Sequence, residues 1–460
     1  MRWAVSELPQ GWAFASLNEL QAQGGIFADG DWIESKDQDP NGRNRLLQLA
    51  DIGDGRFIDK SSRYVNDETF DRLNCTALEE GDILLARMPD PLGRACLMPR
   101  LPQRCLTVVD VAVFRSGSRD ISHRWLMHTL NASPIREEIS RNASGTTRKR
   151  IARGKLAELK VPVPPAAEQK RIAQKLDALL AQVDTLKARI DAIPALLKRF
   201  RQSVINHGVS GSLALDQHAS FDTTTWRNMR AEDVCTKVQS GGTPKEGLTT
   251  EGIPFLKVYN IVDGIIEFEY RPQYIAADIH QGSCRKSITI PGDVLMNIVG
   301  PPLGKIAVVP QGVDEWNINQ AITLFRPSES ISSAWIHLVL LEGTNIRRVS
   351  QETKGSAGQV NISLSQCRDF VFPVPPTQIQ DEIVRRVEQL FAYADQLEAK
   401  VAAAKQRIDA LTQSLLAKAF RGELVPQDPT DEPASALLER IRAQRAAAPK
   451  PKRGRKAATS

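Results

Sequence analysis

One stretch of the sequence, VPVPPAAEQKRIAQKL at residues 161–176, shows how the rest of the chain is organised. A matching stretch, FPVPPTQIQDEIVRRV, occupies residues 372–387, so the two lie 211 positions apart. With the same shift the chain aligns on itself without a gap from about residue 81 to residue 213. A repeat unit of this length is too long for a solenoid. The repeat therefore predicts two homologous modules in tandem, each with its own binding head.

Each of these stretches opens a segment in which apolar residues recur every seven positions. Their spacing alternates between four and three, which is typical of the contact face of a coiled coil. The proline cluster before each segment disfavours helix, so it marks the junction between a globular head and a helix. We call these apolar positions the seam. The seam residues are Ile172, Leu176, Leu179, Val183, Leu186 and Ile190 in the first segment, and Ile383, Val387, Leu390, Leu397, Val401 and Ile408 in the second.

Pro194 lies inside the first helical segment, where it removes a backbone donor and crowds the preceding turn. We expect a kink or a short break near Ile193. The second segment carries Lys405 at the matching place and has no such feature. At about 1.5 Å per residue, each helix would be roughly 50 Å long. Two matched seams in one chain most simply pair with each other, and an antiparallel pairing would relate the two heads by a pseudo-twofold axis.

These boundaries divide the chain into six parts. We predict a first head at residues 1–165, a first spacer helix at 166–207, a linker at 208–220, a second head at 221–376, a second spacer helix at 377–421 and a tail at 422–460. Both heads show short apolar strand patterns and N-capped helices, which begin after Ser122 and Ser332. The predicted fold class is α+β, with two mixed α/β heads in tandem, two long antiparallel coiled-coil helices and an internal pseudo-twofold repeat. Before residue 81 the heads correspond poorly, so we expect them to differ in target there.

Two shorter elements are also predicted. Ser133-Pro134 has the pattern of a helix N-cap followed by proline at the first helical position. In the tail, Leu437, Leu438 and Ile441 fall on one face of a short amphipathic helix, which we expect to be exposed for docking. The segment 449–456 is basic and proline-rich, a composition typical of disorder.

Bulk composition narrows the class of protein. A length of 460 residues is compatible with roughly three domains. The chain has no apolar run of about eighteen residues and no apolar segment at its N-terminus, so neither a membrane span nor a signal peptide is expected. Its six cysteines are scattered without a CxxC pair, which indicates reduced thiols and a cytoplasmic location. The net charge of +6 weakly favours a polyanionic partner.

Signatures of catalysis are missing from the sequence. The stretch GPPLGK at residues 300–305 resembles a phosphate loop, but its glycine spacing is wrong and Ile306 stands where Ser or Thr should follow the lysine. No Asn-Pro-Pro-aromatic or Asp-Pro-Pro-aromatic tetrapeptide is present, which disfavours an amino-methyltransferase site. There is also no HExxH motif or Cys/His cluster. The chain is therefore predicted to be a binding protein and not an enzyme, with no metal and no cofactor of its own.

Basic clusters indicate where a polyanion would bind. Residues 141–155 hold six cations and no acid around the polar turn Ser144-Gly145-Thr146-Thr147. Such loops neutralise phosphates and let the backbone approach closely, although a solvated surface has the same composition. The DNA-binding candidates are Arg87, Arg94, Arg141, Arg148, Lys149, Arg150, Arg153 and Lys155 in the first head, and Lys305, Arg347, Arg348 and Lys354 in the second. Further polar residues that could reach base edges cannot be ranked and include Arg43, Asn44, Gln48, Lys257, Tyr259, Asn260 and Asn297.

Together these features resemble the specificity subunit of type I restriction-modification systems. The resemblance rests on two dissimilar heads, each followed by a proline run and a heptad helix. It also rests on local strings, namely LPQGW at 8–12, EQKRI at 168–172, FRGEL at 420–424 and DEP at 431–433. It covers nearly the whole chain and implies two target recognition domains that each read one half of a split site in double-stranded DNA. It further implies helices that set the gap and dock methyltransferase subunits, two copies by the symmetry of the repeat, which motor-nuclease subunits then join.

Two other functions remain open from the residues alone. A stand-alone two-headed DNA-binding regulator would bind specifically without a partner. A coiled-coil scaffold would bind proteins through both heads and would be indifferent to DNA. Because phosphate contacts release counterions, steep weakening with salt separates DNA binding from the scaffold hypothesis.

Overall fold

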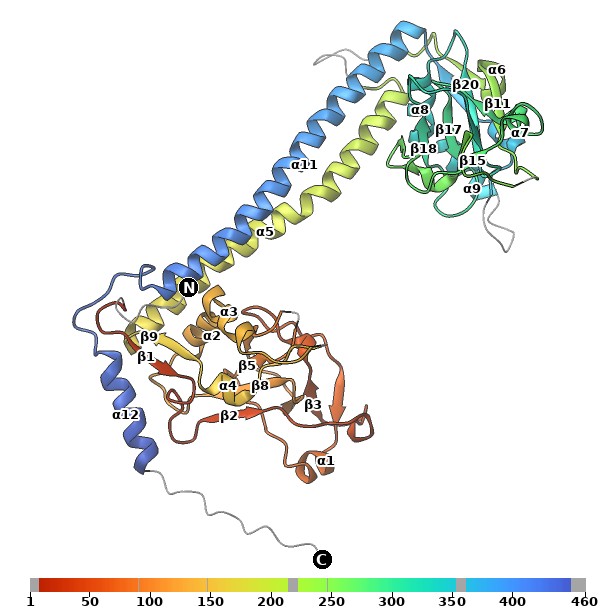
Figure 1. Ribbon diagram of the computed structural model, residues 1–460. Coiled ribbons are helices and arrows are strands. Elements are labelled where there is room, and N and C mark those ends of the chain that lie inside the picture. The colour runs from red at the N-terminus through yellow and green to blue at the C-terminus, as the bar shows by residue number, and fades with distance from the viewer. Residues whose placement is uncertain are drawn as a thin grey trace, which may run out of the picture. The chain divides into compact units, whose positions relative to one another are not determined.

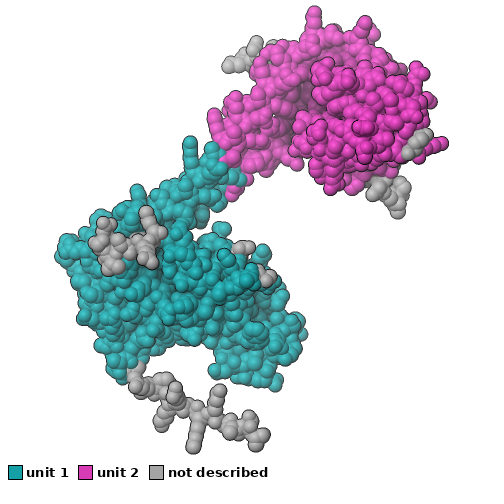
Figure 2. Space-filling model, in the orientation of Figure 1, with its two compact units in different colours: residues 1–190, 403–460 teal, residues 191–402 magenta. Residues whose placement is uncertain are grey.

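The computed structural model describes residues 8–89, 91–146, 148–213, 222–245, 247–352 and 361–447. Its chain forms two compact units, coloured teal and magenta in Figure 2. The first unit contains residues 1–190 together with 403–460, and the second contains residues 191–402. The first unit thus draws on both ends of the sequence, an arrangement that the linear order of the predicted domains does not reveal.

Small sheets form the framework of the first head (Figure 1). The strands are β1 Ala13–Ser16, β2 Ile26–Asp29, β3 Asn44–Leu47, β4 Arg63–Val65, β5 Ile83–Ala86, β6 Ala95–Leu97, β7 Cys105–Thr107, β8 Val111–Arg115 and β9 Lys160–Val163. Four of them pair in the order β2-β8-β5-β6, and three in the order β4-β3-β7. Strand β1 pairs with β9, which fixes the beginning of the head against the strand that leads into the first long helix.

Among the described residues of the first head the α-helices are α1 Asp67–Arg72, α2 His123–Asn131, α3 Ser133–Arg141 and α4 Arg153–Ala157. The predicted N-cap of α2 is confirmed, because the Ser122 hydroxyl accepts a hydrogen bond from the Trp125 N–H at 3.2 Å. The prediction for Ser133 was wrong. Ala132 ends α2 and is also the N-cap of α3, so Ser133 already lies inside the helix. Its hydroxyl donates instead to the side chain of Gln413.

The second head contains a corresponding set of strands. They are β10 Arg227–Arg230, β11 Cys235–Ser240, β12 Ile253–Leu256, β13 Ile261–Val262, β14 Ile265–Ile266, β15 Tyr274–Ile275, β16 Ile288–Thr289, β17 Val294–Asn297, β18 Ile306–Val308, β19 Trp316–Ile318, β20 Ile322–Pro327 and β21 Val371–Val374. Its helices are α6 Ala231–Val234, α7 Ala277–Gln281, α8 Ser333–Glu342, α9 Thr344–Glu352 and α10 Leu364–Arg368. The main sheets have the orders β11-β20-β17-β18 and β15-β12-β19-β16, and β10 pairs with β21.

The strand order of the two heads corresponds even before residue 81, where their sequences correspond poorly, although the second head adds β16 to its second sheet. In each head an early strand borders the four-stranded sheet, β2 in the first and β11 in the second. In each head one parallel pair lies in the other sheet, β3 with β7 and β12 with β19. The two heads therefore share a framework and differ mainly in the side chains and loops that it carries.

Two helices of 44 residues each, α5 Ala166–Val209 and α11 Thr377–Phe420, contribute to both units. Helix α5 runs unbroken through Pro194, so the expected break near Ile193 is absent. Proline has no backbone N–H to donate at this place, yet the residues on both sides of it remain helical. Within the described residues no helix combines the length and apolar content that crossing a bilayer requires.

The seam is buried near the heads and more open elsewhere. In the first unit Ile172, Leu176, Val183 and Ile408 are buried, as are Ile383 and Val387 in the second. Leu179, Ile190, Leu390, Leu397 and Val401 are partly buried. The prediction was wrong for Leu186, whose exposed fraction is 47%. Polar contacts flank the seam, with Lys187 and Asp409 joined at 2.9 Å in the first unit, and Arg201 and Asp395 joined at 2.7 Å in the second.

The tail helix α12, Ala434–Ala447, packs against the first head (Figure 1). Its residues Leu437, Leu438 and Ile441 are buried in one apolar core with the head and the end of α11. The expectation that this face is exposed for docking was therefore wrong. Polar contacts reinforce the packing, because the Ala434 N–H donates to the Gly11 carbonyl at 2.8 Å. The segment 449–456 lies outside the described residues.

Candidate nucleic-acid interface

The basic cluster of the first head runs from the end of α3, through a closed turn, into α4. The N–H of Ser144 donates to the Arg150 carbonyl at 2.9 Å, and the Arg150 N–H donates to the Ser144 carbonyl at 2.8 Å. Gly145 has φ +111°, a backbone conformation that glycine adopts without strain. These two reciprocal bonds hold the base of the turn together.

The six cations of this cluster do not have the same surroundings. Arg141 and Lys155 are exposed but pair with Glu138 at 2.7 Å and Glu158 at 3.4 Å. The Arg150 side chain donates to the Val109 carbonyl, and the Arg153 side chain donates to the Phe27 carbonyl. Arg148 and Lys149 are exposed. Neither forms an ion pair within the described part of the chain, so these two are the best placed to meet a phosphate.

Arg87 and Arg94 were predicted to bind DNA, but the structure removes both from the candidate interface. Their exposed fractions are only 5% and 7%. The Arg87 side chain donates to the carbonyls of Ile151 and Val109 and pairs with Asp29. The Arg94 side chain donates to the Leu49 carbonyl at 2.7 Å and also to the Ile52 carbonyl. A buried guanidinium that is held in this way is unable to reach DNA. Both arginines support surface loops from beneath.

A groove of about 700 Å³ adjoins the basic turn. Lys149 and Arg141 line it together with Arg136 and Glu137, and prolines 89 and 91 form another part of its wall. The Arg136 side chain is mostly buried and pairs with Asp54 at 2.7 Å. Three of its charged lining residues are cations and one is an acid, which is compatible with a nucleic-acid backbone.

The candidates of the second head are less clustered. Arg347 pairs with Glu342 on the preceding helix at 2.7 Å, and the Arg348 side chain donates to the Asp369 carbonyl at 3.2 Å. Lys305 is partly buried at the start of β18. Lys354 lies outside the described residues. The Asn297 side chain is buried and donates to the Pro302 carbonyl at 2.9 Å, so it shapes a loop and does not reach outward.

Some exposed cations were missed by sequence reasoning. Arg56, Lys60 and Arg63 lie between β3 and β4 of the first head or at the start of β4, and all three are exposed. They are separated in sequence by apolar, polar and acidic residues, so no run of charge marks them. Only the structure shows that the acids between and beside them are paired elsewhere.

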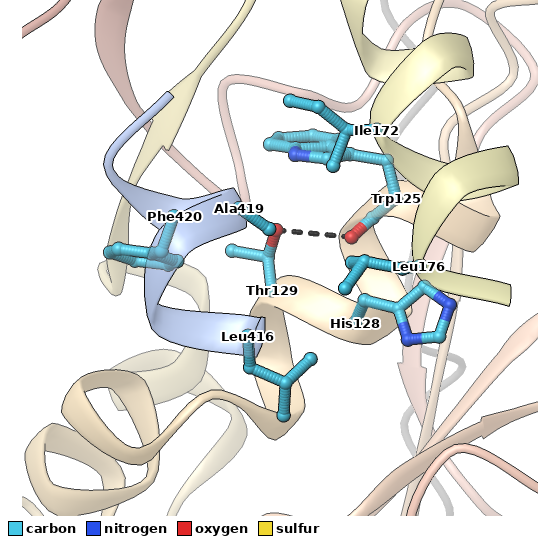
Figure 3. A pocket seen from close by; sticks show the side chains of 8 residues that line it. All are labelled: Trp125, His128, Thr129, Ile172, Leu176, Leu416, Ala419 and Phe420. Carbon is cyan, nitrogen blue, oxygen red and sulfur yellow. Dashed lines mark hydrogen bonds between the residues drawn. The ribbon is translucent and has the colours of Figure 1, made fainter. Parts of the chain in front are cut away.

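The two long helices meet the first head at a small cavity (Figure 3). Its walls come from three helices, with Trp125, His128 and Thr129 on α2, Ile172 and Leu176 on α5, and Leu416, Ala419 and Phe420 on α11. The Thr129 hydroxyl donates to the Trp125 carbonyl at 3.0 Å. With a volume of about 10 Å³, the cavity holds at most one water and is a packing defect, not a ligand site.

The described residues offer little for catalysis. They contain no group of three or more His, Cys, Asp or Glu side chains that could hold a metal ion. Burial raises the pKa of Cys96, Cys235 and Cys367 to about 12, so these thiols stay protonated near neutral pH and are poor nucleophiles. The candidate site consists of exposed Arg and Lys side chains, which can bind anionic groups.

Comparison with known proteins shows which family this chain belongs to. The model of the type I restriction modification DNA specificity domain matches twice, over residues 9–195 and 223–404. The chain belongs to this family. Each match covers one head and the first part of the long helix that follows it, so this specificity chain contains the family domain in duplicate.

Whole-length relatives agree. The specificity subunit of the type I restriction enzyme EcoKI of Escherichia coli K12 is 33% identical over 469 residues, which cover 98% of this specificity chain and 99% of that one. The StySPI specificity subunit of Salmonella potsdam is 34% identical over 373 residues, covering 78% and 79%. The HsdS subunit from Thermoanaerobacter tengcongensis has a TM-score of 0.59 at 19% identity, covering 92% and 100%. A chain from a study of type I R-M complex assembly has a TM-score of 0.66 at 19% identity, covering 91% and 99%. At this identity, the solved structures show a common fold.

Proposed function

We propose that the chain is the DNA-reading subunit of a type I restriction-modification complex, in which each head recognises one half of a split site in double-stranded DNA. The observation that carries this proposal is the duplicated framework. Two heads with one strand order present different exposed side chains, as reading two different half-sites requires. The alternatives of a stand-alone regulator and a scaffold have no comparable support, because the family match covers both heads.

The long helices have a second role in this proposal. Helices α5 and α11 would form an antiparallel coiled coil that sets the gap between the half-sites and relates the heads by a pseudo-twofold axis. Antiparallel ion pairs support this pairing, since Lys187 joins Asp409 while Arg201 joins Asp395. A pseudo-twofold repeat offers two equivalent surfaces, so two methyltransferase subunits would dock on it, and motor-nuclease subunits would join that core. The catalytic residues and cofactors of the complex would lie on those partners.

Replacing one head tests this function. Exchange of residues 1–165 for the same region of a relative is expected to change one half of the methylated motif and leave the other half intact. Genome-wide methylation mapping in the host, with the gene intact, deleted or exchanged, provides the measurement. Loss of one split motif on deletion supports the proposal. A motif altered in both halves by the exchange contradicts the assignment of one half-site to each head.

Substitution of the two unpaired cations in the turn between α3 and α4 should weaken DNA binding without changing sequence preference. In Arg148→Gln with Lys149→Gln, we expect the slope of log K against log salt to fall by about 2, since each neutralised phosphate contributes about 0.9. Binding to cognate and unrelated duplexes should weaken alike. The exposed Arg119→Gln serves as the control. An unchanged slope would remove this turn from the interface.

A further inference from the structure

The loop between β3 and β4 of the first head is held from beneath by one buried carboxylate. Asp51 ends a short 3₁₀ turn, Leu49–Asp51, and is fully buried. It accepts hydrogen bonds from the N–H groups of Gln48, Lys60 and Ser61, each at 2.7 Å, and from the Ser61 hydroxyl. Burial tends to raise the pKa of Asp51, but these bonds outweigh it and leave the pKa below its usual value. The loop therefore has an ionised internal anchor.

Two buried arginines brace the same loop. Arg94 donates to the carbonyls of Leu49 and Ile52, on the side where the loop begins. Arg45 donates to the Ser61 carbonyl at 2.8 Å and pairs with Asp59, on the side where it ends. Groups on both sides of the loop are thus fixed, so its outward side chains do not have to order the backbone when they bind.

The outward side chains of this loop form a basic surface. Arg56, Lys60 and Arg63 are exposed, and none of the three has an ion-pair partner among the residues that the structure describes. The two nearby acids are already engaged, because Asp54 pairs with Arg136 and Asp59 with Arg45. We call Arg56, Lys60 and Arg63 the basic loop surface. Ile58 lies among them in the sequence with an exposed fraction of 47%.

The second head has a buried side chain at the same anchor position. This side chain is an amide, which donates hydrogen bonds as well as accepting one. Asn260 also ends a 3₁₀ turn, Val258–Asn260, and is buried. Its side-chain oxygen accepts from the Lys257 N–H at 2.9 Å, as Asp51 accepts from Gln48. Its amide nitrogen, however, donates to the carbonyls of Glu267 and Tyr270, both at 3.0 Å. The loop of the second head thus turns carbonyl groups toward its anchor, which explains an amide in place of the carboxylate.

The two anchored loops also differ in charge. The exposed charged residues between Asn260 and β15 are Asp263, Glu267, Glu269 and Arg271. Acids therefore outnumber bases there by three to one, whereas the loop of the first head exposes three unpaired cations and two acids, Asp54 and Asp59, that are each paired with an arginine. The framework is shared, and the exposed net charge at this position is positive in the first head and negative in the second.

We propose that the basic loop surface of Arg56, Lys60 and Arg63 binds the phosphate backbone of duplex DNA, and that the equivalent loop of the second head makes no such contact. The proposal rests on the DNA-reading function proposed above and adds that its two heads contribute unequally to the electrostatic part of binding. The first head holds the DNA backbone through a preordered loop, and Asp51 is the positioning residue that keeps the loop in its binding conformation.

The test is a salt titration of binding by the full-length chain, alone and together with its methyltransferase subunits, to a mixed-sequence duplex of about 30 base pairs, roughly three helical turns. Because backbone contacts do not depend on sequence, the recognised motif need not be known. In Arg56→Gln with Lys60→Gln and Arg63→Gln, the slope of log K against log salt should fall by about 2 to 3, at about 0.9 for each phosphate that is no longer neutralised. The control carries Arg100→Gln, Arg119→Gln and Lys160→Gln, which remove three exposed cations elsewhere in the first head.

The outcomes separate the two proposals. If the unsubstituted chain binds the duplex neither alone nor together with its methyltransferase subunits, the DNA-reading function itself fails. If it binds and the triple variant keeps its slope, or the control falls equally, the basic loop surface does not hold the DNA backbone. A variant that binds DNA normally but no longer binds an associated protein subunit would assign the surface to a protein partner and would also overturn the inference.

Matched anchor variants test the positioning role of Asp51. Both carboxylate oxygens of Asp51 accept hydrogen bonds from the loop. Asp51→Asn replaces one of these oxygens with an amide nitrogen, which cannot accept. The loop should therefore loosen, and the salt slope should fall although all three cations remain. Asn260→Asp makes the reverse isosteric change at the equivalent place and should leave the slope unchanged. If Asp51→Asn and Asn260→Asp gave the same slope of log K against log salt, Asp51 would not position the loop for DNA binding. The exposed triple variant keeps the inference testable if an anchor variant fails to fold.

Discussion

Replacing Leu437 with alanine is expected to destabilise the first unit by about 2–5 kcal/mol, because the substitution removes a buried side chain and leaves a cavity. The Leu437 side chain is 1% exposed and belongs to the core that joins α12 to the first head. At about 1.4 kcal/mol for each factor of ten, amide exchange through opening of this unit should accelerate roughly 30-fold or more. Hydrogen–deuterium exchange in β1 and α12 provides the measurement.

The second unit is an internal reference for this experiment. Strand β21 in that unit should keep its protection in Leu437→Ala, because no described residue of α12 belongs to its core. Glu439→Ala changes an exposed residue of the same helix and should leave both units unaltered. If β1 exchanged at its original rate in Leu437→Ala, the tail helix would not be part of the stable fold of the first head.

Lengthening both long helices by one heptad should enlarge the recognised gap by about three base pairs. Seven residues add about 10.5 Å of helix, at about 1.5 Å per residue, and duplex DNA rises about 3.4 Å per base pair. The insertions would repeat residues 184–190 after Ile190 and residues 403–409 before Ala403, at the boundary of the first unit on each helix. A whole heptad preserves the seam, so the pairing of the helices survives. Methylation mapping reads the new gap.

A matched variant separates length from disruption. The same insertion in α5 alone would leave seven residues without partners on α11, and we expect loss of methylation from it, not a longer gap. An unchanged gap in the double insertion would exclude the helices as the ruler. Methylation with a gap of variable length would indicate that the heads are not held at a fixed separation.

The long helices could be predicted from the sequence because a seven-residue period survives over many turns and proline clusters mark both entrances. The predicted bounds are 166–207 and 377–421, and the structure has Ala166–Val209 and Thr377–Phe420. Periodicity could not foresee that Leu186 is exposed, since a repeat marks which face is apolar and does not show how closely the partner approaches it. The same limit applies to α12, whose apolar face was recognised but whose partner, the first head, is distant in sequence.

The sequence alone did not show which basic residues are available to bind DNA, because availability depends on burial and on pairing within the fold. Arg87 and Arg94 have the residue type that DNA contacts require, yet both point inward and hold backbone carbonyls. Arg56 and Lys60 sit in an unremarkable stretch, and only the pairing of the neighbouring acids leaves them available. Composition counts cations, whereas binding depends on which of them lack an internal partner.

The participation of both chain ends in the first unit has a consequence for synthesis on the ribosome. The second unit is one continuous stretch, residues 191–402, and can close its core as soon as that stretch has emerged. The core of the first unit takes Leu416, Phe420, Leu437 and Ile441 from the far end of the chain. The head that is translated first is therefore completed last. Until then its apolar surface stays open to chaperones, and a message that stops early yields a finished second unit beside an unfinished first one.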